Sequence, residues 1–233
     1  AVYISLFGNG SAGKDKIAID MRLYSDCIDF YTSGSNLYGY SFSANKTYRI
    51  EIVANVKKNT YSVFINGKAV AADIAMRNGT ISELTKIRLW TTTAPLAATV
   101  TYDNLDIYYL NEAPEKPVNP DVPVTPDIPA PVTPTELTDN RWIYRDTFED
   151  IGKWTSMGTS GAANSVSINA NKQLAITDDA DTIVSAVRVL DKALTEEVVI
   201  EFEVASSELS ANSALYFSLF GNGTAGKDKI AVD

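Results

Sequence analysis

Residues 1–20 read AVYISLFGNGSAGKDKIAID, and residues 214–233 read ALYFSLFGNGTAGKDKIAVD. The two stretches are identical at sixteen of twenty positions at an offset of 213, and Val2 and Ile4 are replaced by the apolar Leu215 and Phe217. A repeat at a fixed offset is typical of a tandem array. Because this offset far exceeds the period of a solenoid, each repeat is expected to be a whole domain plus its linker.

This repeat predicts that neither end of the chain is a domain end. Residues 1–110 are expected to be the C-terminal part of one repeat and residues 139–233 the N-terminal part of the next. Segment 139–213, followed by segment 1–110 of a neighbour, would make one complete domain. The residues expected to form duplicated assembly strands are Tyr3, Leu6, Phe7, Tyr216, Leu219 and Phe220.

Residues 111–138 are expected to be a proline-rich linker, because eight of the nine prolines lie there. Six of them recur at every third position, namely Pro114, Pro117, Pro120, Pro123, Pro126 and Pro129. Three residues is the period of polyproline II, so the segment is predicted to be a stiff spacer. Recognition by an SH3 or WW domain is the alternative, but the segment lacks the basic flank that such ligands carry.

The rest of the chain predicts an all-β fold. Short runs rich in β-branched and aromatic residues are separated by Gly, Asn, Ser and Asp. Asn66-Gly67 predicts a type I′ hairpin turn after residues 61–65, and residues 81–85 are expected to form one helical turn. Residues 197–205 alternate strictly, which predicts a strand with one apolar and one solvated face.

Composition excludes several functions. The net charge of −9 argues against nucleic-acid binding, and the chain has no histidine to act as a general base or metal ligand. No segment reaches the roughly 18 apolar residues of a membrane span. The single cysteine, Cys27, is predicted to be a small apolar core residue. Few cysteines, repetition and a proline spacer together favour an extracellular protein on a bacterial surface.

Three segments resemble concanavalin A-like and laminin G-like jelly-roll domains. They are YRDTFEDIGKW at residues 144–154, YRIEIVANVKKNTYSVFINGKAV at 48–70 and VTYDNLDIYYL at 100–110. The resemblance implies a jelly-roll β-sandwich of two antiparallel sheets, present here as two complementary part-domains. It implies no single activity, because these domains serve as lectins, glucanases, carbohydrate-binding modules and spacers.

The resemblance also suggests sites. Glucanases of this fold carry an E-x-D-x-E strand, and the nearest match is Glu201-Phe-Glu203-Val-Ala205, which lacks the third acid; a solvated strand face is the alternative. Related modules hold a structural calcium ion between the first and last strands. The residues that would bind it here are Asp146, Glu149, Asp150 and Asp103. The alternative is that Asp146 and Asp150 cap turns and Asp103 bonds to the backbone.

A glycan site is a further hypothesis. Aromatic side chains supply flat stacking surfaces for sugars, and the candidates are Tyr24, Tyr31, Tyr38, Tyr40 and Trp90. Burial of these residues in the core of the sandwich is the alternative.

The leading interpretation is a structural repeat of an extracellular array or filament whose partners are identical copies. The chain is a window of a continuous array, a folded-back permutant, or a subunit that exchanges strands. A carbohydrate-binding or adhesive module is the alternative function, and a glucanase-like glycoside hydrolase is third.

Overall fold

The computed structural model describes residues 2–4, 15–24, 26–32, 35–77, 81–91, 98–110, 142–157, 164–178, 183–207 and 214–222. Every regular element in these ranges is a β-strand, and the strands form two antiparallel sheets. The all-β class predicted from the sequence is therefore confirmed. The proline row and the rest of residues 111–138 lie outside the described residues.

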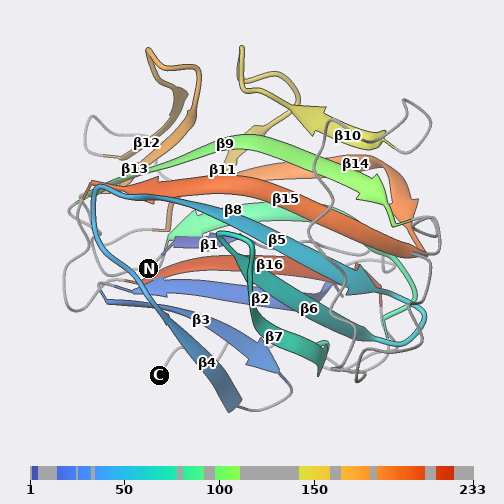
Figure 1. Cartoon of the computed structure of the whole chain (residues 1–233). Coiled ribbons are helices and arrows are strands. Elements are labelled where there is room, and N and C mark those ends of the chain that lie inside the picture. Colours follow the sequence, from blue (N-terminus) through green and yellow to red (C-terminus); the bar gives the residue numbers. More distant parts are fainter. Residues whose placement is uncertain are drawn as a thin grey trace, which may run out of the picture.

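Two sheets face each other across one hydrophobic core, in the manner of a β-sandwich (Figure 1). Sheet A consists in spatial order of β11 (Thr155–Met157), β14 (Ser185–Leu194), β8 (Leu84–Thr91), β1 (Val2–Ile4), β2 (Asp15–Tyr24), β3 (Cys27–Thr32) and β4 (Ser35–Ser41), with β16 (Ala214–Asn222) also paired to β2 and β8. Sheet B consists of β12 (Asn164–Ile168), β13 (Leu174–Asp178), β9 (Ala98–Tyr109), β15 (Glu197–Ser206), β5 (Thr47–Asn55), β6 (Thr60–Ile65) and β7 (Lys68–Ala75), with β10 (Trp142–Asp146) paired to β9.

Each sheet takes strands from both sides of residues 111–138. In sheet B, β15 lies between β5 and β9, and in sheet A, β14 lies beside β8. In Figure 1 the orange and red strands of the second half are interleaved with the blue and green strands of the first. The two halves of the sequence therefore build one core in common.

Alternation along the strands explains this core. On β15 the side chains of Val198, Ile200, Phe202 and Val204 are at most 1% exposed, and they pack with apolar residues of both sheets. Successive residues of a strand point to opposite faces, so one apolar residue in two is enough to line the inside of a sandwich. The predicted apolar face of residues 197–205 is confirmed.

The opposite face of the same strand differs from the prediction. The alternation assigns Val199 and Glu201 to a solvated face, but they are only 2% and 8% exposed, so that expectation is wrong. Glu201 is able to lie in this buried position because the guanidinium of Arg49, on the neighbouring strand, pairs with its carboxylate. An alternating pattern identifies the two faces of a strand but does not say which of them is covered.

Of the two local elements predicted from the sequence, the hairpin turn is confirmed and the helical turn is wrong. Asn66 and Gly67 have φ angles of 51° and 74° and connect β6 to β7, as a type I′ turn requires. The helical turn expected at residues 81–85 is wrong, because residues 81–83 are irregular and Leu84 already begins β8. Pairing of β8 with β14 draws Leu84 into the sheet, opposite Leu194. No helix within the described residues is long and apolar enough to cross a membrane.

Candidate functional site

The duplicated strands meet at one place in sheet A, between β2 and β8. We call this position the β2–β8 slot. The other edge of β8 pairs with β14, with Trp90 opposite Ser185, and the other edge of β2 pairs with β3, with Arg22 opposite Asp29. A strand has two hydrogen-bonding edges, so the slot holds one further strand.

Both copies of the duplicated sequence pair with this slot in the same register. Tyr3 and Tyr216 are each opposite Arg22 on β2 and Trp90 on β8. Ile4 and Phe217 are each opposite Leu89. The two copies are therefore alternative occupants of the slot.

The two copies extend along the slot to different lengths. β16 is nine residues long and β1 is three. Of the residues predicted to form assembly strands, Tyr3, Tyr216, Leu219 and Phe220 have pairing partners in the slot. Leu6 and Phe7 lie outside the described residues.

The flanking strands present charged and aromatic side chains beside the slot. The guanidinium of Arg22 pairs with the carboxylate of Asp29 at 2.8 Å. On the other side the guanidinium of Arg88 lies 4.6 Å from the ring centre of Trp90. Arg22 and Asp29 lie on the neighbouring strands β2 and β3, and Arg88 and Trp90 both lie on β8, so these contacts join residues of the strands that flank the slot.

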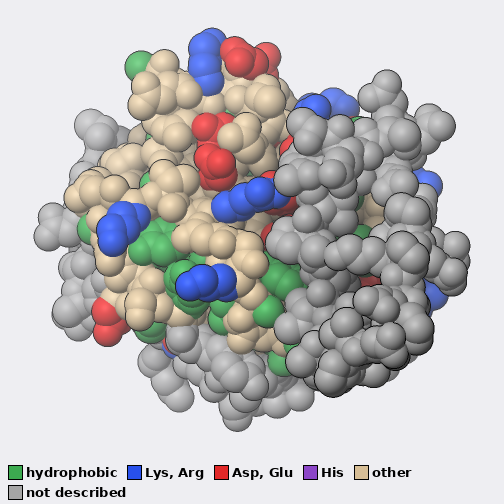
Figure 2. All heavy atoms as spheres, in the orientation of Figure 1, with side chains coloured by type: hydrophobic (Ala, Val, Ile, Leu, Met, Phe, Trp, Pro, Cys, Tyr) green, Lys and Arg blue, Asp and Glu red, His purple; other side chains and the backbone are tan. Residues whose placement is uncertain are grey.

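A second cluster lies on the outer face of sheet B. Asp106, Glu201 and Glu51 are direct register partners on β9, β15 and β5, and all three are less than 9% exposed; we call them the acid row. Arg49 Nε pairs with Glu201 Oε1 at 2.7 Å, and Arg145 Nε pairs with Asp106 Oδ1 at 3.0 Å. Figure 2 shows one face of the molecule, on which acidic, basic and hydrophobic side chains lie close together.

Burial raises the pKa values of two carboxyl groups in the acid row. Burial, together with the charge of Glu201, raises the pKa of Glu51 to about 7, although Arg49 opposes the shift. Burial likewise raises the pKa of Asp106, against the hydrogen bond from Arg145. Like charges opposite each other in a sheet repel, so a proton on Glu51 relieves the repulsion in the row. The arrangement can therefore hold and release a proton near neutral pH.

The acid row is only partly visible in the sequence. Glu201 and Glu203 are the nearest match to a catalytic pattern, and the structure places Glu203 opposite Arg49 and Asp103 on either side. Sequence reasoning misses Glu51 and Asp106, because they join Glu201 only through strand pairing. One signal is present: Glu51 stands between Ile50 and Ile52 in an otherwise apolar run.

The proposed calcium ligands make other contacts. Asp146 Oδ1 accepts the backbone N–H of Phe148 at 2.8 Å in the turn after β10, and Asp103 Oδ1 accepts that of Asn104 at 2.8 Å within β9. The alternative predicts these two contacts, a turn cap by Asp146 and a backbone bond by Asp103. Glu149 pairs with Lys172 at 3.2 Å, and Asp150 is exposed. No group of three or more His, Cys, Asp or Glu among the described residues could hold a metal ion. The calcium site stays a prediction.

The proposed glycan-binding aromatics whose side chains are described make contacts within the protein. Trp90 is 3% exposed, Tyr40 packs against Tyr48 at the core with their ring centres 6.3 Å apart, and the Tyr31 ring lies 4.6 Å from the guanidinium of Arg77. The side chains of Tyr24 and Tyr38 lie outside the described residues. The glycan site stays a prediction.

Cys27 is not a core residue, so that prediction is wrong. Ile28 and Phe30 take the core-facing positions of β3, and Cys27 is half-buried on the other face. Its thiol donates to Asp29 Oδ1 at 3.5 Å. Burial and the nearby charge of Asp29 raise the pKa of the thiol to about 12. The thiol is therefore protonated at neutral pH and is a poor nucleophile.

Comparison with protein-family models and with curated proteins finds no match for this chain.

Proposed function

We propose that this protein is a structural repeat unit of an extracellular tandem array or filament, in which neighbouring copies complete each other's β-sandwich. The observation that carries the proposal is the common register of β1 and β16 in the β2–β8 slot. In a continuous array, residues 214–222 of one copy are residues 1–9 of the next. A single strand then follows β15, fills the slot and precedes β2, so nothing is duplicated.

The register of β16 on β2 supports this reading. Asn222 is opposite Asp15, and Asn222 corresponds to Asn9 in the repeat. A continuous chain would therefore pass from this strand into β2 through residues 10–14. A loop of five residues is a common hairpin connection. The pairing between the two ends of this chain is thus the pairing that a local hairpin would have.

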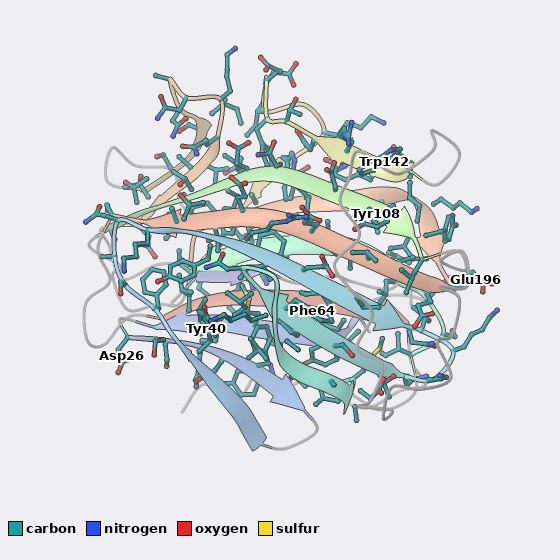
Figure 3. The ribbon with its side chains drawn as sticks, in the orientation of Figure 1. Asp26, Tyr40, Phe64, Tyr108, Trp142 and Glu196 are labelled. Carbon is teal, nitrogen blue, oxygen red and sulfur yellow. The ribbon has the colours of Figure 1, made fainter. Side chains whose placement is uncertain are left out.

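The edge of sheet B supports a spacer role. β10 pairs with the end of β9, with Trp142 opposite Tyr108, and the two rings lie 5.3 Å apart (Figure 3). A linker entering at Trp142 and one leaving at Leu110 would therefore attach at adjacent points. Each domain would then project to one side of the row of linkers. The stiff prolines would set the spacing between domains.

The remaining features of the proposal follow from the sequence. We propose the jelly-roll topology of concanavalin-like domains, a location on the surface of a bacterial cell, and a structural rather than catalytic role. The proline row supplies the distance between domains, and the duplicated strand supplies the junction.

The test is a chain in which residues 139–213 run directly into residues 1–110, without the linker. It should unfold in one cooperative transition, with a midpoint within about 5 °C of that of the full chain, because its core is the same. An unfolded product would contradict the proposal. Electron microscopy of native material should then show domains at regular intervals, whereas discrete single particles would contradict the array.

A further inference from the structure

The chain contains two donor strands for one acceptor slot, β16 and the N-terminal copy that includes β1. When one donor occupies the slot, the other has no place in that sheet. A strand with unpaired N–H and C=O groups is a template for pairing with another chain. The slot therefore takes one copy of this strand at a time, whether the copy belongs to the same molecule or to another.

We propose that the β2–β8 slot also accepts residues 214–222 from a second copy of the chain, so that separate molecules exchange strands. This inference rests on the proposed function, because it takes the slot to be the place where copies join. Main-chain hydrogen bonds supply most of the affinity in strand addition, and they do not depend on whether the donor is in the same molecule.

The slot should distinguish between the two donors. Leu215, Phe217 and Leu219 are opposite Leu23, Met21 and Ile19, which are fully buried core residues of β2. Directly opposed residues lie on the same face of a sheet, so these three positions belong to the core face. The N-terminal copy has the smaller Val2 and Ile4 at the first two of them.

The size difference predicts a preference. Each further CH₂ group at a core-facing position favours pairing with the slot several-fold, because it is removed from water. Residues 214–222 should therefore occupy the slot on the order of tenfold more than residues 1–9. The donor strand and the acceptor slot are different surfaces of the same chain. Exchange between separate molecules is thus head-to-tail, and it produces rings or open chains.

The experiment uses full chains in which Cys27→Ser removes the native thiol. Ser218 is opposite Arg88 across the slot. Directly opposed residues lie about 4.5–5.5 Å apart between Cα atoms, within the disulfide range of about 4.4–6.8 Å. S218C chains are mixed with R88C chains under mild oxidation, and the disulfides are identified by mass spectrometry. In the control, V189C replaces R88C, because Val189 is an exposed residue of β14 outside the slot.

Strand exchange predicts a disulfide between positions 88 and 218 of different chains, at least tenfold more abundant than the one between 189 and 218. An S5C chain, which has the cysteine at the equivalent N-terminal position, should give about tenfold less product with R88C than S218C does. The double variant S218C/R88C reports occupancy of the slot within one molecule.

The outcomes separate the two proposals. A disulfide within the double variant, with only the V189C background in the mixture, overturns strand exchange and leaves the proposed function intact. No 88–218 disulfide in either sample, from chains whose near-ultraviolet circular dichroism is native, overturns both. If R88C chains do not fold, Y216C with R22C replaces the pair, because Tyr216 is opposite Arg22 on β2.

Discussion

Asp146 holds the turn that follows β10. Its carboxylate accepts three hydrogen bonds, from the Tyr144 hydroxyl at 2.5 Å, the Phe148 N–H at 2.8 Å and the Trp154 indole N–H at 2.7 Å. Phe148 and Trp154 are buried, and Phe148 has a φ of 53°, which is costly for a bulky residue. The single carboxylate therefore stabilises a strained backbone and satisfies a buried donor.

Replacing Asp146 should destabilise the fold. Asp146→Ala leaves the buried indole N–H of Trp154 without its acceptor, so the free energy of unfolding should fall by about 2–3 kcal/mol. Urea unfolding measures the change. Asp103→Ala is the control, because Asp103 lies in β9 and its carboxylate accepts an exposed backbone N–H from Asn104, so its loss should cost about 0.5 kcal/mol. Stabilisation of the wild type by calcium, absent in Asp146→Asn, would instead support the predicted calcium site.

Glu51 makes stability depend on pH. Its pKa rises from an ordinary value of 4.5 to about 7 in the folded state, because burial disfavours the charge. Between those two values the unfolded chain has already lost the proton that the folded chain retains. The contribution of Glu51 to the free energy of unfolding therefore has its full value below about pH 4.5. It is lost as the pH rises through 7.

Replacing Glu51 by its neutral isostere should remove this loss. Glu51→Gln should raise the free energy of unfolding at pH 8 by about 1–3 kcal/mol and leave it nearly unchanged at pH 4.5. Denaturant unfolding at a series of pH values measures the effect. Glu149→Gln is the control, since it makes the same chemical change at an exposed carboxylate outside the acid row. Parallel pH profiles for wild type and Glu51→Gln would show that Glu51 titrates normally.

At the scale of elements, one bulge decides how β9 fits between its neighbours. Tyr102 and Leu105 are both core residues although three positions separate them, an odd spacing that a regular strand would put on opposite faces. The register on β15 shifts here, and Asn104 has a φ of 50°. The extra residue returns the alternation to phase and brings Asp106 opposite Glu201.

The bulge should tolerate glycine but not a β-branched residue. Asn104→Val should lower the free energy of unfolding by about 1–2 kcal/mol, since a positive φ is unfavourable for L-residues other than Asn, Asp and Gly. Asn104→Gly should change it by less than about 0.5 kcal/mol. Urea unfolding compares the two, and Thr101→Val, on the regular part of β9, controls for the side chain itself. Equal stability of the two Asn104 variants would exclude backbone strain as the cause.

At the scale of the whole molecule, the attachment points decide how the domain responds to tension. β9 ends and β10 begins at the same place, with Trp142 opposite Tyr108. Tension applied through linkers at these two points would separate the β9–β10 pair one residue at a time. The hydrogen-bonded pairs of β9 and β10 then carry the load one after another. A pair of strands resists this unzipping less than it resists shear along the strands.

Single-molecule pulling should reveal this weakness. A chain joining residues 139–213 to residues 1–110, held by its two ends, should unfold at low force. Moving one handle to Thr99, at the other end of β9, loads the same strand pair in shear and should raise the unfolding force. Equal forces in the two geometries would mean that the β9–β10 pair is not the first to separate. The domains would then resist tension with contacts other than the β9–β10 pair.

The sequence by itself determined the repeat, the strand content and the inner faces. The offset of 213 is visible in the letters, and alternation on β15 and the Asn66-Gly67 turn depend on neighbouring residues only. The tertiary structure decided which strands become neighbours. The common slot of β1 and β16, the burial of Glu201 and the acid row all arise from pairing between residues far apart in the chain. Such pairing is a property of the assembled sheets, because backbone hydrogen bonds between strands carry no local sequence signal.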